Sequence, residues 1–198
     1  MSSFVMMRHG ESQWNRENRF TGFTDVDLND KGMTEAKSAG TALKGIKFDK
    51  VYTSTLKRAY HTAALAMEAA GQNPPVVKHD DLRERDYGDL TGLNKDETRE
   101  KFGAEQVQIW RRSYDVNPPG GESLKDVVAR VRPYFEAHIL PDLRAGKNIL
   151  LAAHGNTLRA MLIVLGENTP ENINTAEIAT GVPLVFEYAG GKLQRRAA

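Results

Sequence analysis

The chain has 198 residues, of which 40% are hydrophobic, and it carries a formal net charge of +1. Length and composition predict one globular domain over residues 1–198, large enough to fold without disulfides or structural metals. A net charge this close to zero gives no reason to expect binding to nucleic acid or to an anionic membrane. The absence of cysteine excludes disulfides and thiolate metal ligands and fits a cytoplasmic protein. No segment approaches the roughly 18 apolar residues of a membrane span.

The first half of the chain predicts strands alternating with helices. The predicted elements are a strand over 3–7, a polar connection over 10–30, a helix from 29 or 30, a strand over 48–53, a helix from 54 to about 70 and a short strand over 76–78. Asn29 or Asp30 is the expected N-cap of the first helix, and Ser54 that of the second. A polar connection as long as 10–30 is usually functional in a compact domain.

The second half continues the alternation. It predicts a turn-rich stretch over 80–93, helices over 95–102 and 105–112, a break at 117–121, a long amphipathic helix from 122, a strand over 149–153, a helix over 155–166, an edge strand over 183–188 and a hairpin into 192–195. Strands alternating with helices predict an α/β fold of three layers. Its sheet is expected to be mostly parallel, with an antiparallel edge strand and helices on both faces.

Two apolar runs far apart in the chain both end at a histidine followed by glycine, at His9 and at His154. Each run predicts a buried strand that delivers its last side chain to an edge of the sheet. Open α/β sheets bind ligands outside the carboxyl ends of their strands, so the two histidines are expected to lie together there. Arg8 adds a fixed positive charge, and a helix starting at Gly155 would turn its first amides toward an anion. The pattern therefore predicts an anion site that contains a nucleophile.

His9 is the candidate nucleophile, because a neutral imidazole nitrogen can attack a phosphoryl group and hold it. Its other nitrogen should then donate to a fixed acceptor, such as a backbone carbonyl of the loop. His154 is a candidate donor to a phosphoryl oxygen as charge builds in the transition state. Both histidines could instead be buried polar tethers. A two-histidine metal site lacks a carboxylate at ligand spacing, so no metal is expected.

The run Arg8-His9-Gly10-Glu11, taken with the distant His154, resembles the histidine phosphatase superfamily. The fifteen-residue run from Arg8 to Gly22 is similar to the 2,3-bisphosphoglycerate-dependent phosphoglycerate mutases within it, and further similarity follows along most of the chain. The resemblance implies the phosphoglycerate mutase-like fold and the interconversion of 3-phosphoglycerate and 2-phosphoglycerate in glycolysis and gluconeogenesis. It also implies a phosphohistidine on His9, priming by 2,3-bisphosphoglycerate, and no metal.

The same resemblance implies roles for single residues. Arg58 resembles a second phosphate-binding arginine, whose planar fork of donors a lysine cannot copy. Glu84 resembles the acid and base for the substrate hydroxyl, although alone it would be interpreted as a solvated loop side chain. The implied substrate contacts are Arg8, His9, Gly10, Glu11, Ser12, Gln13, Trp14, Asn15, Thr21, Gly22, Arg58, Glu84, Arg85, Asp86, Tyr87, Lys95, Arg111, Arg112, Gly155 and Asn156.

The number of cations favours a mutase over its rivals. A phosphatase of the same superfamily needs cations for one phosphate, whereas a mutase must also hold a carboxylate and a second phosphate. A non-catalytic phosphoanion-binding module is expected to lack the nucleophile or the acid, and neither is missing. Two departures from longer mutases are the short connection at 117–121 and the absence of an extended tail. They leave lid closure and a homodimer open.

Overall fold

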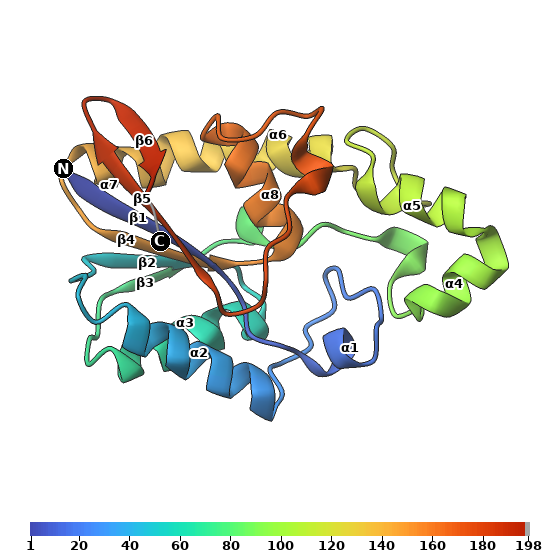
Figure 1. Cartoon of the computed structure of the whole chain (residues 1–198), viewed down its shortest axis with the longest axis horizontal. Coiled ribbons are helices and arrows are strands. Elements are labelled where there is room, and N and C mark those ends of the chain that lie inside the picture. The colour runs from blue at the N-terminus through green and yellow to red at the C-terminus, as the bar shows by residue number, and fades with distance from the viewer. Residues whose placement is uncertain (197–198) are drawn as a thin grey trace.

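The computed structural model describes residues 1–196, which form a six-stranded sheet between two layers of helices (Figure 1). The strands are β1 (Ser2–Arg8), β2 (Lys50–Thr53), β3 (Val76–Lys78), β4 (Ile149–Ala153), β5 (Pro183–Ala189) and β6 (Lys192–Arg195). Their order is β3-β2-β4-β1-β5-β6. The first four of these are mutually parallel, and β5 and β6 add antiparallel pairs at one edge. The predicted fold class is therefore confirmed.

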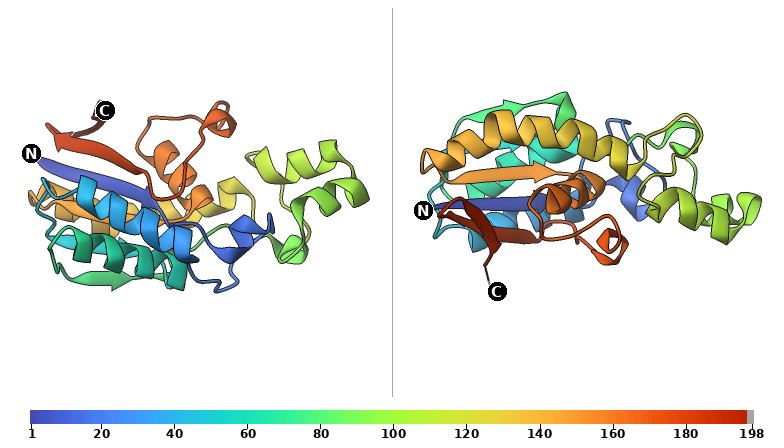
Figure 2. Two further views of the ribbon diagram at one scale, coloured as in Figure 1. Left: turned by 60° about the horizontal axis from the view of Figure 1, so that its bottom comes forward. Right: turned by 90° about the horizontal axis from the view of Figure 1, so that it is seen from above.

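Helices cover both faces of the sheet, and a helical hairpin extends beyond the carboxyl ends of its parallel strands (Figures 1 and 2). The helices are α1 (Gln13–Arg16), α2 (Asp30–Ala42), α3 (Lys57–Ala69), α4 (Lys95–Phe102), α5 (Ala104–Arg112), α6 (Leu124–Tyr134), α7 (Leu140–Arg144) and α8 (Gly155–Val164). Short 3-10 turns span Asp80–Leu82, Gly88–Leu90 and Ile173–Thr175, and a π-helical turn, Phe135–Ile139, joins α6 to α7. No helix within the described residues is long and apolar enough to cross a membrane.

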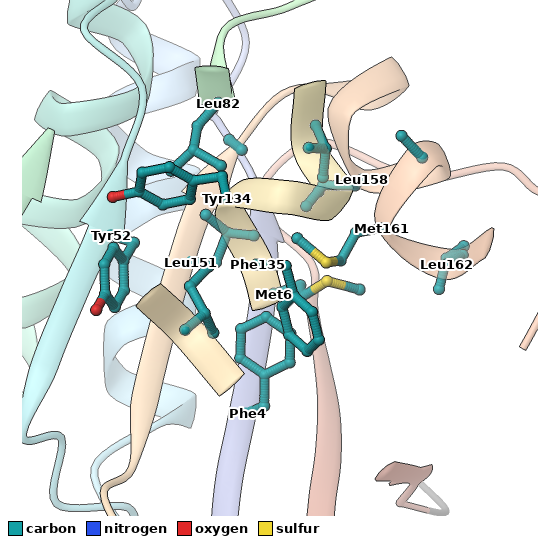
Figure 3. Packing of buried hydrophobic residues seen from close by; sticks show 14 of the residues in the cluster. Phe4, Met6, Tyr52, Leu82, Tyr134, Phe135, Leu151, Leu158, Met161 and Leu162 are labelled. Carbon is teal, nitrogen blue, oxygen red and sulfur yellow. The ribbon is translucent and has the colours of Figure 1, made fainter. Parts of the chain in front are cut away.

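The alternating side chains of β1 divide between two cores. Phe4 and Met6 pack among residues of α6 and α8, and Figure 3 shows them beside Phe135 and Met161. Val5 and Met7 point to the opposite face and pack against α2 and α3. All four strand side chains have no solvent exposure. A strand buried on both faces reads as a continuous apolar run, which is why the sequence shows no polar alternation here.

Two predicted helix starts differ from the structure. Asn29 caps α2 as predicted, by accepting the N–H of Gly32. Ser54 does not cap α3, because the N-cap position is Leu56 and has no side-chain cap bond. The helix expected from residue 122 begins at Leu124, where Ser123 forms the cap. The prediction for Ser54 was wrong because α3 starts two residues later than expected; the hydroxyl of Ser54 accepts the N–H of Leu56 outside the helix and contacts His154.

The contact between α2 and α3 depends on Gly40. A Cβ at this position would lie 2.0 Å from the carbonyl oxygen of Ala66. We expect Gly40→Ala to lower the free energy of unfolding by about 1–3 kcal/mol, since overpacking against backbone outweighs the gain of roughly 1 kcal/mol in helix propensity. Urea unfolding measures this change. Gly45→Ala is the control, because a Cβ there meets no atom within 4 Å. Equal stability of the two variants would contradict the expectation.

Candidate active site

The two histidines lie side by side at the carboxyl ends of neighbouring strands. β1 and β4 are parallel, with Arg8 opposite Ala153 in the register, so His9 and His154 leave the sheet at the same level. Their ring centroids are 5.2 Å apart. Only 2% of His9 and none of His154 is exposed to solvent. The structure thus brings together the two residues that the sequence placed at one site.

The surroundings of His9 leave one of its nitrogens free to act as a nucleophile. Nδ1 lies 2.6 Å from the carbonyl oxygen of Gly10, which can only accept, so Nδ1 carries the hydrogen. The amide of Gly10 is held in turn by Thr62 Oγ1 at 3.0 Å. Burial, together with the Arg58 and Arg8 cations, lowers the pKa of His9 well below its usual value. Near neutral pH the imidazole is therefore uncharged, with the Nε2 lone pair available.

His154 lies beside His9 and has one nitrogen without a partner among the described residues. Its Nε2 is 2.7 Å from Ser54 Oγ. Its Nδ1 is buried and makes no hydrogen bond to any described residue, and the same holds for Nε of Arg8 and of Arg58. Burial, Arg58 and His9 lower the pKa of His154 well below its usual value. Buried polar atoms are normally satisfied, so three such atoms around one nucleophile indicate a site for an oxygen-rich anion.

Arg58 is positioned from α3 by the long connection after β1. Its Nη1 and Nη2 donate to the carbonyl oxygens of Thr24 and Gly22, both at 2.7 Å. Burial lowers its pKa to about 10, which keeps it charged at neutral pH. The connection predicted to be functional therefore fixes the orientation of Arg58, the side chain expected from sequence to bind phosphate.

Glu84 faces the same cleft with one carboxylate oxygen anchored. Oε1 accepts the backbone N–H of Arg85 at 2.8 Å and that of Asn156, at the start of α8, at 3.1 Å. Glu84 lines the cleft and is only 8% exposed. Because both anchoring bonds use Oε1, the other oxygen is left to exchange a proton with a ligand.

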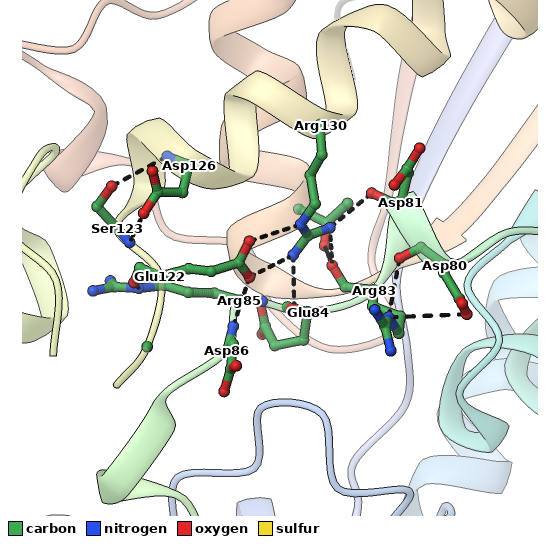
Figure 4. Close-up of polar contacts among 12 residues, drawn as sticks. Asp80, Asp81, Arg83, Glu84, Arg85, Asp86, Glu122, Ser123, Asp126 and Arg130 are labelled. Carbon is green, nitrogen blue, oxygen red and sulfur yellow. Dashed lines mark hydrogen bonds and ion pairs between the residues drawn. The ribbon is translucent and has the colours of Figure 1, made fainter. Parts of the chain in front are cut away.

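The segment that carries Glu84 has no regular structure and is held by Arg130 of α6 (Figure 4). The guanidinium of Arg130 donates to the carbonyl oxygens of Asp81, Arg83 and Glu84 at 2.7 to 2.9 Å. It also pairs with the carboxylate of Glu122 through two bonds of 3.0 Å. All its donor groups are used, so α6 fixes the backbone on which the carboxylate of Glu84 stands.

Arg85 does not lie on the cleft. It is fully buried, and its guanidinium donates to the backbone carbonyls of Glu122, Trp110 and Arg111. These bonds satisfy the exposed carbonyls at the end of α5 and tie that helix to the segment of Glu84. In this structure Arg85 therefore supports the backbone at the end of α5 and does not make the direct ligand contact expected from sequence.

The remaining predicted residues divide between the cleft and its supports. The cleft is lined by the predicted Arg8, His9, Asn15, Thr21, Gly22, Arg58, Glu84, Tyr87, Lys95, Arg111, Arg112, Gly155 and Asn156. The predicted Gly10, Glu11, Ser12, Gln13, Trp14, Arg85, Asp86 and His154 are not on the lining, and His154 lies fully buried beside His9. Several of these hold the loop instead: Ser12 caps α1 through a capping box with Asn15, and the Glu11 amide donates to Glu35.

Sequence reasoning missed four lining residues, namely Arg19, Phe20, Arg159 and Ile178. Arg159 lies one helical turn after Asn156 on α8, and its Nη1 donates to Asn156 Oδ1 at 3.3 Å. The spacing of three residues was the available signal, because such pairs share a helix face. Burial, with the nearby Arg112, lowers the pKa of Arg159 to about 10.

The far end of the cleft is rich in cations. Lys95 comes from α4, Arg111 and Arg112 come from α5, and Arg159 comes from α8. Burial and repulsion by Arg111 and Arg8 lower the pKa of Lys95 to about 8. This second set can neutralise another anionic group of a ligand whose phosphate lies beside His9. Within residues 1–196 no cluster of three or more histidine or carboxylate side chains is arranged for a metal ion.

Comparison with known proteins agrees with this geometry. Residues 4–197 match the family model of the histidine phosphatase superfamily (branch 1). The chain is 57% identical over 185 residues to a 2,3-bisphosphoglycerate-dependent phosphoglycerate mutase of Nitrobacter hamburgensis, covering 92% of this chain and 89% of that protein. A mutase of the same description from Bradyrhizobium sp. (strain ORS 278) is 55% identical with the same coverage.

Solved structures show the same fold at lower identity. One is described as mycobacterial hydrolase 1, with a TM-score of 0.86, 25% identity and coverage of 100% of this chain and 98% of that one. Another is a mycobacterial glucosyl-3-phosphoglycerate phosphatase in complex with VO3, with a TM-score of 0.85, 28% identity and coverage of 99% and 98%. The chain belongs to the histidine phosphatase superfamily (branch 1), and within it to the family of the 2,3-bisphosphoglycerate-dependent phosphoglycerate mutases.

Proposed function

We propose that the protein interconverts 3-phosphoglycerate and 2-phosphoglycerate through a phosphohistidine on His9, primed by 2,3-bisphosphoglycerate. The observation that carries this proposal is one cleft that holds more cations than a single phosphate needs. Arg8 and Arg58 lie around the uncharged His9, and Lys95, Arg111, Arg112 and Arg159 are added from α4, α5 and α8. Identities of 52–57% to mutases over 92% of the chain support it. The reaction is a step of glycolysis and, in reverse, of gluconeogenesis.

Priming transfers a phosphoryl group from the bisphosphate to the enzyme. The Nε2 lone pair of His9 attacks phosphorus, and the ester bond between phosphorus and oxygen breaks. The leaving oxygen takes a proton from the carboxyl group of Glu84, which becomes a carboxylate. Arg8, Arg58 and His154 stabilise the negative charge on the phosphoryl oxygens during the transfer.

Transfer to substrate runs the same chemistry in the opposite direction. A hydroxyl of bound monophosphoglycerate attacks the phosphohistidine, the bond between phosphorus and nitrogen breaks, and Glu84 accepts the hydroxyl proton. The bisphosphate so formed reorients and returns its other phosphoryl group to His9, while Glu84 gives the proton back. The enzyme is unchanged after each cycle, and the arginines perform the neutralisation for which other phosphoryl-transfer enzymes use metal ions.

A phosphatase of the same superfamily is the main rival. It would share His9 and Arg8 but would release phosphate to water, and it would not need the far set of cations. One assay separates these functions: the protein is mixed with 3-phosphoglycerate, with and without 2,3-bisphosphoglycerate, and 2-phosphoglycerate and free phosphate are followed. A mutase forms 2-phosphoglycerate only with primer, a phosphatase releases phosphate, and a binding module does neither. A homodimer and a cytoplasmic location stay predictions from sequence.

Replacing the nucleophile should remove the covalent intermediate. We expect His9→Ala to abolish both mutase activity and acid-labile phosphoenzyme, because His9 is the only histidine among the described residues that line the cleft. Labelling with radioactive 2,3-bisphosphoglycerate measures the intermediate. His61→Ala on the exposed side of α3 is the matched control and should label like the wild type. Wild-type labelling of the His9 variant would overturn the assignment.

Glu84→Gln should slow transfer to substrate more than priming. The amide keeps the oxygen that accepts from Arg85 and Asn156, so only the proton-exchanging atom changes. Both steps should slow by about 10²–10⁴, the usual scale of general acid–base catalysis. Transfer should suffer more, because a hydroxyl that keeps its proton is a poor nucleophile, whereas water partly replaces an acid. Single-turnover quench of formation and discharge of the phosphoenzyme tests this, with Glu97→Gln as control; wild-type rates would exclude the role.

The buried histidines should make stability depend on pH. Their folded-state pKa values are lowered, so the unfolded chain binds protons near pH 6.5 that the folded chain does not. The free energy of unfolding therefore keeps the full contribution of the neutral histidines above about pH 6.5. Below that pH it decreases by about 1.4 kcal/mol per pH unit for each histidine. Urea unfolding between pH 7.5 and 5.5 measures the slope. His154→Asn should reduce it by the equivalent of one proton, and an unchanged slope would speak against a neutral His154.

A further inference from the structure

Ser54 is a fully buried hydroxyl between the end of β2 and the start of α3, in contact with His154. We propose that Ser54 fixes the tautomer of His154, so that Nδ1 carries the hydrogen and donates it to the phosphoryl group in transfer. Ser54 is then a positioning residue that acts through His154. The inference rests on the proposed function, because it takes the phosphoryl group to lie beside His9.

The hydrogen bonds of Ser54 limit where its own hydrogen can go. Oγ accepts the backbone N–H of Leu56 at 3.2 Å, so that contact uses a lone pair. Oγ also lies 2.7 Å from Nε2 of His154, and within residues 1–196 it has no other hydrogen-bond partner. A serine hydroxyl has one hydrogen to donate. The direction of the bond to His154 therefore decides whether that hydrogen is used.

The other ring nitrogen has no partner within residues 1–196, and the ring that carries it lies directly beside the ring of His9, with 5.2 Å between the two centroids. Nδ1 of His154 is buried, without a partner among the described residues, and it shares this property with Nε of Arg8 and Arg58. A nitrogen that carries hydrogen can donate to a phosphoryl oxygen. A nitrogen that presents a lone pair would instead repel the oxygens at the moment when their negative charge increases.

The two neutral tautomers differ in how many groups they satisfy. With hydrogen on Nε2, the imidazole donates to Ser54, the hydroxyl hydrogen has no acceptor, and the Nδ1 lone pair meets the anion. With hydrogen on Nδ1, the hydroxyl donates to Nε2, and every polar hydrogen of the pair has an acceptor once an anion binds. Unmade hydrogen bonds of buried groups are costly, which favours the second arrangement. Burial and the neighbouring Arg58 disfavour a doubly protonated ring.

The consequence is that the two histidines hold the same tautomer and use it in opposite ways. His9 donates its Nδ1 hydrogen to the carbonyl oxygen of Gly10, and its Nε2 lone pair is the nucleophile. His154 is held from the Nε2 side by Ser54 and presents its Nδ1 hydrogen as donor. Ser54 and Arg58 are four residues apart in the segment that leads into α3. This segment therefore holds the neutral donor His154, through Ser54, and also supplies the cation Arg58.

Nitrogen NMR of the ligand-free wild-type protein tests the tautomer directly. Spectra of ¹⁵N-histidine protein distinguish a protonated ring nitrogen from an unprotonated one, and the signals of His154 are those that disappear in His154→Asn. We expect Nδ1 to be protonated and Nε2 unprotonated. Protonation on Nε2 would overturn the proposal. This readout needs no activity, so a failure to form 2-phosphoglycerate would count against the proposed function alone.

Ser54→Ala tests the consequence for catalysis. We expect a mixed or reversed tautomer of His154 and phosphoenzyme formation slowed by about 10²-fold, the scale for losing one transition-state donor. Ser2→Ala is the matched control, because Ser2 is an equally buried hydroxyl that donates to the carbonyl of Leu143 far from the cleft. In a His154→Asn background, Ser54→Ala should cause no further loss of rate.

Independent, multiplying losses of rate in the double variant would mean that Ser54 does not act through His154, and the proposal would fall. An unchanged spectrum and rate in Ser54→Ala would do the same. If Ser54→Ala does not fold, the wild-type spectrum still decides the tautomer, and Ser54→Thr, which keeps a hydroxyl, should keep the protonation pattern.

Discussion

The parallel pairing of β1 with β4 is the constraint on which the site depends. Paired residues of these strands are 145 positions apart in the chain, yet their register sets Arg8 against Ala153 and so places the histidine that follows each strand at one level. Successive side chains of a strand point to opposite faces, so a slip by one residue would move His9 away from its partner and would also turn both apolar faces of β1 to the wrong cores. The burial of Phe4 and Val5 on opposite faces thus fixes the position of His9, the proposed nucleophile.

A cleft this rich in cations must be held open against its own repulsion. The protein orients these cations through backbone carbonyls: Gly22 and Thr24 accept from Arg58, Ile178 accepts from Arg8, and Ala176 accepts from Arg159. Carbonyl oxygens orient a guanidinium without cancelling its charge, so the positive potential stays available to an anionic ligand. Ligand binding then relieves repulsion that the folded protein otherwise carries, and should stabilise the fold through linkage.

The sequence predicted the sheet, most of its helices and the meeting of the two histidines, because these follow from apolar runs, glycine positions and the rule that ligands bind at strand ends. The short α1 inside the polar connection and the π-helical turn that divides α6 from α7 were not predicted. It did not predict which way individual polar side chains turn. Ser54 has the ordinary features of an N-cap, but its hydroxyl is captured by His154, and no local pattern carries that information. Arg85 lies within a run that resembles ligand-binding residues, yet its guanidinium donates to the carbonyl oxygens at the end of α5. Arg159 was not predicted as a site residue because the residues around it on α8 are mostly apolar, so its sequence context gave little sign of a binding site.

The hairpin of α4 and α5 gathers Lys95, Arg111 and Arg112 into one uninterrupted stretch of chain that meets the body through a small cluster of Phe20, Leu90 and Val107. The phosphoryl-transfer residues, by contrast, are distributed over strand ends and helices that share the main cores. Three of the four cations proposed to hold the distal part of a substrate therefore come from one hairpin, and only Arg159 comes from the body of the fold. Replacing the hairpin would therefore change most of the charge that a ligand meets beyond His9 while leaving both main cores untouched.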